Sequence, residues 1–107
     1  MRHTLNLDLA IMAKVNEDDD HPGCGQVGHG GIVEFNRSYG LEDHPFVLIT
    51  VDPHTPHTEQ LLVGLYMSEA DYHEGAPARV QCVALGADDD VQRGADAVAD
   101  MLRTGGA

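Results

Sequence analysis

Short apolar segments, separated by polar, glycine-rich or proline-containing stretches, run along most of this chain, and only the last has helical spacing. We expect strands at residues 5–15, 32–39, 46–51, 61–67 and 78–85. The last segment places Val91, Ala95, Val98 and Leu102 four, three and four residues apart, which predicts an amphipathic helix. Consecutive strands followed by a helix are typical of an α+β domain. We therefore predict an antiparallel sheet of about five strands, a meander or a partly open barrel, with one C-terminal helix packed on a face.

The first of these segments has the most regular pattern. The odd positions from Leu5 to Val15 are all apolar, whereas the even positions include Asp8 and Lys14. Alternation with a period of two predicts a strand with one buried face, because the same residues in a helix would scatter around its axis. The odd positions should then face the core, and a charge at Leu9 should cost about 3 kcal/mol or more. Asp8 should face water.

Two further local patterns concern the connections between strands. Residues 21–31 form a glycine-rich stretch that contains a G-x-G-x-x-G match from Gly23 to Gly28. In dinucleotide-binding proteins this motif opens a helix, but here a predicted strand follows, so we expect a loop that binds no nucleotide. Residues 68–74 could form one helical turn with Ser68 as its N-cap.

The charge balance limits the possible partners. Eighteen acidic residues stand against six basic ones, which gives a net charge of −12, and Lys14 is the single lysine. A field of this sign repels nucleic acids and anionic membranes, so direct binding to either is not expected. Three explanations stay open: adaptation to a salty cytoplasm or a GC-rich genome, an acidic surface that docks on a basic partner, and mimicry of DNA charge. The acidic run from Asp88 to Asp90 is explained by its place before the predicted last helix, where carboxylates cap a helix, more simply than by a cation site.

The whole chain, residues 1–107, is expected to form a single acidic α+β domain. It contains no apolar segment of the length that a transmembrane helix needs, and it begins without a signal-peptide pattern, so we expect a cytoplasmic protein. Cys24 and Cys82 should then be reduced. Cys82 lies in the fifth predicted strand, where it should pack as a small apolar side chain.

Seven histidines, several of them beside other metal-binding side chains, make metal binding the main chemical hypothesis. Imidazole, thiolate and carboxylate groups at short spacings can chelate zinc. Three polar stretches carry such groups: His21, Cys24 and His29; Asp52, His54 and His57; and Asp71, His73 and Glu74. The first two triplets are the predicted metal ligands. No four-ligand signature is present, however, so we expect no cofactor, with zinc as the alternative.

Catalytic chemistry has weaker support. A Cys24 thiol beside His21 or His29 could form a nucleophile and base, but a glycine-rich stretch offers little preorganisation. We therefore expect a small non-enzymatic interaction module: an accessory subunit, a homo-oligomer or an inhibitor-like protein. Its partner should be another protein, possibly a basic one, or a second copy of the chain. The alternative is a metal-binding protein or a small metal-dependent enzyme that uses the loop histidines, cysteine and aspartates.

Overall fold

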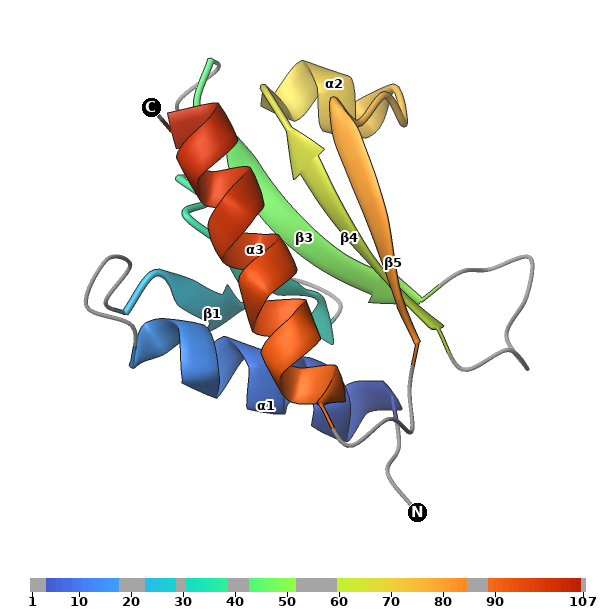
Figure 1. Cartoon of the computed structure of the whole chain (residues 1–107). Helices are drawn as coiled ribbons and strands as arrows, with labels where there is room; N and C mark the ends of the chain where they lie inside the picture. Colours follow the sequence, from blue (N-terminus) through green and yellow to red (C-terminus); the bar gives the residue numbers. More distant parts are fainter. Residues whose placement is uncertain are drawn as a thin grey trace.

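The computed structural model describes residues 4–17, 23–28, 31–38, 43–51, 60–84 and 89–106. These ranges contain three helices and five strands, and Figure 1 shows how they are arranged. The elements in chain order are α1 (Thr4–Asn16), β1 (Gly25–Val27), β2 (Val33–Phe35), β3 (Phe46–Val51), β4 (Gln60–Tyr66), α2 (Glu69–His73), β5 (Arg79–Ala84) and α3 (Asp90–Gly106).

The five strands form one antiparallel sheet in which each strand pairs with the next along the chain, in the order β1-β2-β3-β4-β5. The sheet is an open meander with β1 and β5 at its edges. The predicted α+β class and antiparallel topology are therefore confirmed, and the sheet is not closed into the alternative barrel. β3 is the middle strand, as the continuous apolar run of residues 46–51 predicts.

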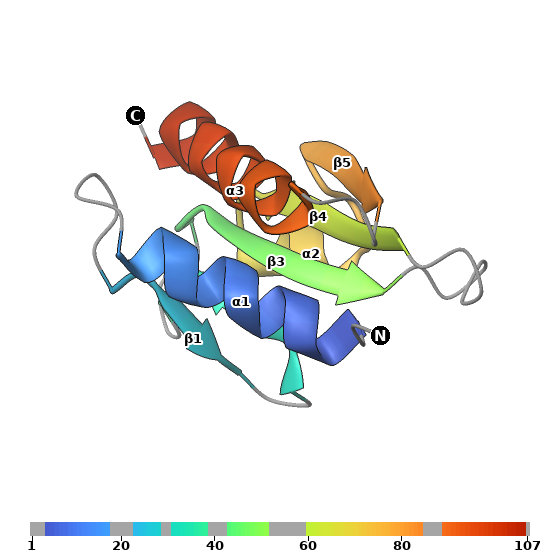
Figure 2. The ribbon, with the colours of Figure 1, turned by 60° about the horizontal axis from the view of Figure 1, so that its bottom comes forward.

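The helices are divided between the two faces of the sheet. Figure 2 shows α1 and α3 on one face, named here the α1/α3 face, and α2 on the opposite face, named the α2 face. Side chains from α1, α3 and alternate positions of the strands form the main core on the α1/α3 face. Its largest members are Leu7, Ile11, Phe35, Leu61, Leu65 and Met101. The predicted packing of the C-terminal helix on one face is therefore confirmed.

The first predicted strand is wrong, because residues 5–15 lie within the helix α1. Leu7, Ile11 and Val15 are buried at intervals of four residues, whereas Leu9 is 43% exposed. An alternating pattern contains this helical set, and α1 buries it against α3 and the sheet. The predicted positions of Leu9 and Asp8 are therefore reversed, since Asp8 is only 6% exposed.

The strand that replaces the first predicted one in the sheet is β1, which comes from the glycine-rich stretch. We had predicted a loop along the whole of this stretch. Residues 25–27 form β1 and pair with β2 at the edge of the sheet. The Asn16 side chain at the end of α1 holds this strand, because its Oδ1 accepts a 2.6 Å hydrogen bond from Gly25 N–H and its Nδ2 donates to Gly25 O. Strand pairing and a contact with α1 override the low strand propensity of this segment.

Two predictions about helices are confirmed: the helical turn capped by Ser68 and the C-terminal helix. Ser68 is the N-cap of α2, and its hydroxyl accepts a 3.1 Å hydrogen bond from Asp71 N–H. α3 begins with Asp90 and has Arg103 in its last turn, in agreement with the helix dipole. It continues to Gly106, slightly beyond the predicted end. Gly94 lies where α3 meets α1, and a Cβ there would overlap the Ile11 side chain, so the two helices approach each other closely.

Candidate functional site

The α2 face of the sheet carries both a buried polar cluster and an apolar depression. Strand register places Gln26, Glu34, Leu48, Gly64 and Val80 in one row across all five strands. These positions alternate with core residues such as Val33 and Val63, so they point away from α1 and α3. The row is polar at β1 and β2 and apolar from β3 to β5.

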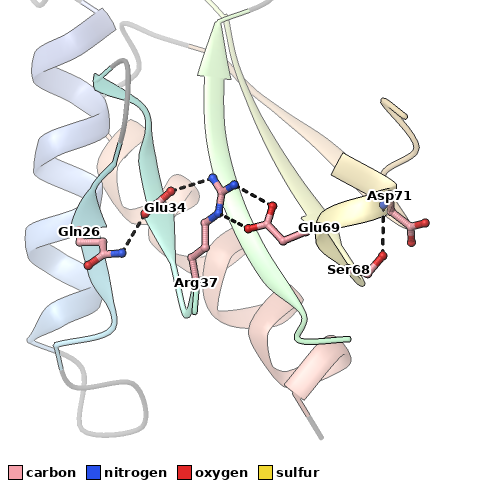
Figure 3. A network of polar contacts seen from close by, with 6 residues as sticks. All are labelled: Gln26, Glu34, Arg37, Ser68, Glu69 and Asp71. Atoms are coloured by element: carbon pink, nitrogen blue, oxygen red, sulfur yellow. Dashed lines mark hydrogen bonds and ion pairs between the residues drawn. The ribbon is translucent and has the colours of Figure 1, made fainter. Parts of the chain in front are cut away.

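The polar end of the row is organised by Arg37. Its Nη1 donates a 2.9 Å hydrogen bond to Glu34 Oε2, and its Nε and Nη2 each donate 2.9 Å hydrogen bonds to the two carboxylate oxygens of Glu69 (Figure 3). Gln26 Nε2 donates to Glu34 Oε1 at 2.8 Å. These four residues are named the Arg37 cluster. The cluster fastens α2, which carries Glu69, to β1 and β2.

Aromatic rings enclose the same guanidinium group. Arg37 Cζ lies 4.8 Å from the centroid of the Phe46 ring and 4.9 Å from that of Tyr72. Tyr66 packs against both rings, at centroid distances of 5.8 Å and 5.3 Å. The Arg37 side chain is 10% exposed and that of Glu34 is 1% exposed, so these charges interact with each other and not with solvent. This arrangement stabilises the position of α2.

The apolar end of the row contains a depression of about 190 Å³, named here the Gly64 hollow. Its lining residues are Leu48, Thr50, Leu62, Gly64, Tyr66, Gly75, Pro77 and Val80. Gly64 belongs to β4 and lacks a side chain on this face, which leaves the space open; a Cβ there would lie 3.4 Å from the Tyr66 ring. None of the eight lining residues is charged, and Val80 is 52% exposed.

Tyr66 is the polar group shared by the hollow and the aromatic cluster. Burial, and then the neighbouring Tyr72, raise the pKa of the Tyr66 phenol above its ordinary value of 10.0. The phenol therefore stays neutral at physiological pH and can donate a hydrogen bond. The hollow thus combines apolar walls with a neutral hydroxyl group, which suits an apolar or amphipathic side chain better than an ion.

A larger groove of about 350 Å³ lies between the end of α1 and the middle of α3. Its lining residues are Lys14, Val15, Glu17, Gln92, Ala95, Asp96 and Ala99. Its polar groups stand on the outer surfaces of helices, and Gln92 and Asp96 are hydrogen bonded to each other along α3 at 2.7 Å. Because Gln92 and Asp96 are bonded to each other and the lining of the Gly64 hollow is uncharged, we take the hollow as the candidate site.

The predicted metal ligands are mostly outside the described residues: His21, His29, Asp52, His54 and His57. Cys24 is described, and it packs half-buried against the core beside α1. The third group, Asp71, His73 and Glu74, belongs to α2 and its C-cap, where His73 lies against the Tyr72 ring. Within the described ranges no three such side chains are grouped as a metal site. The metal site stays a prediction, and elemental analysis of the purified protein tests it.

The environment of Cys82 differs from the prediction, and the Arg37 cluster was not predicted. Cys82 is exposed on the α2 face, so its predicted burial is wrong; β5 is an edge strand whose α2 face is not covered there. The Arg37 cluster was not predicted at all. Glu34, a charged residue between Val33 and Phe35, could have suggested that both faces of β2 are used. The contact between Arg37 and Glu69 spans 32 residues and has no local signal.

A separate buried carboxylate lies on α1. Asp8 is 6% exposed, and its Oδ1 has no hydrogen-bond partner in the part of the chain that the structure describes. Burial raises the pKa of Asp8 above its ordinary value of 3.8, and the backbone N–H groups of Leu9 and Asp8 oppose this rise only in part. The folded state therefore holds this proton to a higher pH than the unfolded chain does. Protonation of Asp8 therefore contributes to the free energy of unfolding. This contribution is fully present below pH 3.8 and is lost as pH rises through the folded-state pKa of Asp8.

We expect Asp8→Asn to stabilise the protein at neutral pH by about 1–3 kcal/mol, because it replaces a carboxylate whose charged form is disfavoured by burial with a neutral amide of the same shape. The gain should shrink as pH falls towards 3.8, where Asp8 itself is protonated. Denaturant unfolding of both proteins at pH 7.5 and pH 4 measures the difference. A loss of stability at pH 7.5 would show that the charged form of Asp8 is needed in the fold.

Comparisons with protein-family models, with curated proteins and with solved structures find no match for this chain. None of the described helices is long and apolar enough to cross a membrane. The geometry of the α2 face is therefore the basis for a functional proposal.

Proposed function

We propose that this protein is a non-enzymatic interaction module that binds a basic segment of another protein at the Gly64 hollow. One observation carries the proposal: 22% of the residues in the chain are charged, yet none of the eight residues that line the hollow is. An uncharged depression with an exposed valine in its wall is typical of a site that accepts an apolar side chain.

The expected charge of the partner follows from charge complementarity. The net charge of −12 attracts basic proteins and repels acidic ones, and this attraction speeds association more than it strengthens the final complex. The expected partner therefore presents an apolar side chain among lysines or arginines. Binding rather than catalysis is proposed because the buried charged groups of this face are bonded to each other in the Arg37 cluster.

A direct test uses a fluorescein-labelled nonapeptide in which Lys and Val alternate, named here the basic probe. We expect Val80→Ser to weaken binding of the basic probe by about tenfold, equivalent to about 1.4 kcal/mol, because it removes apolar wall from the hollow. Val80 is 52% exposed, so the substitution should leave the fold intact. Fluorescence anisotropy gives the dissociation constants.

The chain supplies a matched control. Val27 is 51% exposed and lies in β1, at the opposite edge of the sheet, so Val27→Ser makes the same chemical change away from the hollow. It should not alter binding. A peptide in which Glu replaces Lys should bind at least about tenfold more weakly than the basic probe, with the difference shrinking in 1 M NaCl. Equal effects of the two valine substitutions, or no binding of the basic probe, would overturn the proposal.

A further inference from the structure

We infer that the bound segment is an extended strand that pairs with the outer edge of β5, with one side chain packed on Val80 at the rim of the Gly64 hollow. This inference rests on the proposed function and specifies how the partner binds. β5 is an edge strand that pairs with β4 on one side, and no described strand pairs with it on the other. Figures 1 and 2 show it at the margin of the sheet, away from α1.

The β5 edge lacks the usual features that block strand addition. Such features are proline, lysine, a bulge or a very short strand. β5 has six residues without proline or lysine, and six consecutive residue pairs join it to β4 without a bulge. By contrast, β1 at the other edge has only three residues. The charged side chain of β5, Arg79, is bonded to Asp100 and Thr104 of α3 at 3.1 Å and leaves the rest of the edge open.

The hollow lies beside this edge. Val80 belongs to β5 and is part of the wall of the hollow, and Cys82 lies two residues further on the same face. A strand added next to β5 would place its alternate side chains on the α2 face, about 5 Å from Val80 or Cys82. One of these side chains can therefore pack on Val80 at the rim of the hollow, while the backbone pairs with β5.

Exposed carboxylates flank β5 along the chain and favour a basic strand over a second copy. Glu74 is exposed at the end of α2, before β5, and Asp89 is exposed after it. Asp89 is itself bonded to Arg93, so the excess of acidic over basic residues in the whole chain favours the basic strand more than any single carboxylate does. Pairing of two copies would instead bring together two chains of net charge −12.

The test compares two N-methylated forms of the basic probe, one methylated on the amides of its Val residues and one on those of its Lys residues. In a strand, successive N–H groups point to opposite sides, so only one of the two forms loses the donors that face β5. We expect that form to bind at least about tenfold more weakly and the other to bind nearly as well as the basic probe. If both forms bind as well as the basic probe, strand addition is wrong while binding at the hollow stands.

Amide hydrogen exchange of the protein gives a second readout that does not depend on a variant. On addition of the basic probe, alternate amides of β5 should exchange at least about tenfold more slowly, because they gain hydrogen bonds on the open side. Unchanged exchange in β5, with shifted resonances only at residues of the hollow, would overturn the inference. So would free protein that is already a dimer with these amides protected, since a second copy would then occupy the edge.

Discussion

Arg37→Met is expected to lower the free energy of unfolding by about 3–5 kcal/mol. The substitution removes the cation that donates hydrogen bonds to Glu34 and Glu69, and it leaves the Glu34 carboxylate, 1% exposed, without that arginine. It also removes the charge that lies against the Phe46 and Tyr72 rings. Methionine keeps an apolar stem of similar length, so the loss reports mainly on the charge. Denaturant unfolding measures it.

The control for this prediction is a surface ion pair that also joins an arginine to a carboxylate. Arg93 donates a 2.9 Å hydrogen bond to Asp89, but both side chains are more than half exposed. Arg93→Met should change stability by no more than about 1 kcal/mol, since solvent screens such pairs. The double variant Arg37→Met with Glu34→Gln should recover part of the loss, because no buried charge is then left at that position. Equal losses for Arg37→Met and Arg93→Met would mean that the Arg37 cluster does not hold α2.

Ile11→Ala is expected to lower the free energy of unfolding by about 2–5 kcal/mol. Ile11 is fully buried at the crossing of α1 and α3, where the Gly94 backbone lies against it, so truncation leaves a cavity between rigid elements. Leu9→Ala is the informative comparison. Leu9 is 43% exposed, and its truncation should cost less than about 1 kcal/mol.

This pair of variants distinguishes the two secondary structures that the first segment allows. In a strand, Leu9 and Ile11 would lie on the same buried face, and their truncations would have similar costs. In α1, they lie about 200° apart around the helix axis, and Ile11 is fully buried against Gly94 of α3 whereas Leu9 is 43% exposed. Similar losses for both variants would contradict the helical assignment of residues 4–16 and support the alternation read from the sequence.

Local patterns predicted those parts of the fold in which one segment contains its own signal. The apolar run of residues 46–51 is the middle strand, the spacing from Val91 to Leu102 forms α3, and Ser68 caps α2. Short connections between consecutive strands were sufficient to predict an antiparallel meander. The number of strands was correct although the first predicted strand is a helix, because β1 replaced it in the sheet.

The candidate site could not be predicted in the same way, because its parts come together only through strand register. Gly64 is opposite Leu48 on one side and Val80 on the other, and the sequence alone marks none of these three as a partner of the others. The residues predicted as metal ligands were chosen by type and spacing within single loops. Of these, Cys24 packs against the core, and the others lie outside the described residues.

The sequence by itself determined the acidic charge, the α+β class and the elements whose periodicity allows one structure only. Tertiary structure decided the segments whose local pattern fits two secondary structures. It also decided the contacts that leave no local pattern in the sequence. Leu7, Ile11 and Val15 fit both an alternating strand and one face of a helix, and burial against α3 selects the helix. Glu34 and Arg37 are charges almost removed from solvent that stabilise each other, and a contact across 32 residues joins Arg37 to the partly exposed Glu69. A pattern along the chain records spacing, whereas burial and pairing depend on neighbours that are distant in sequence.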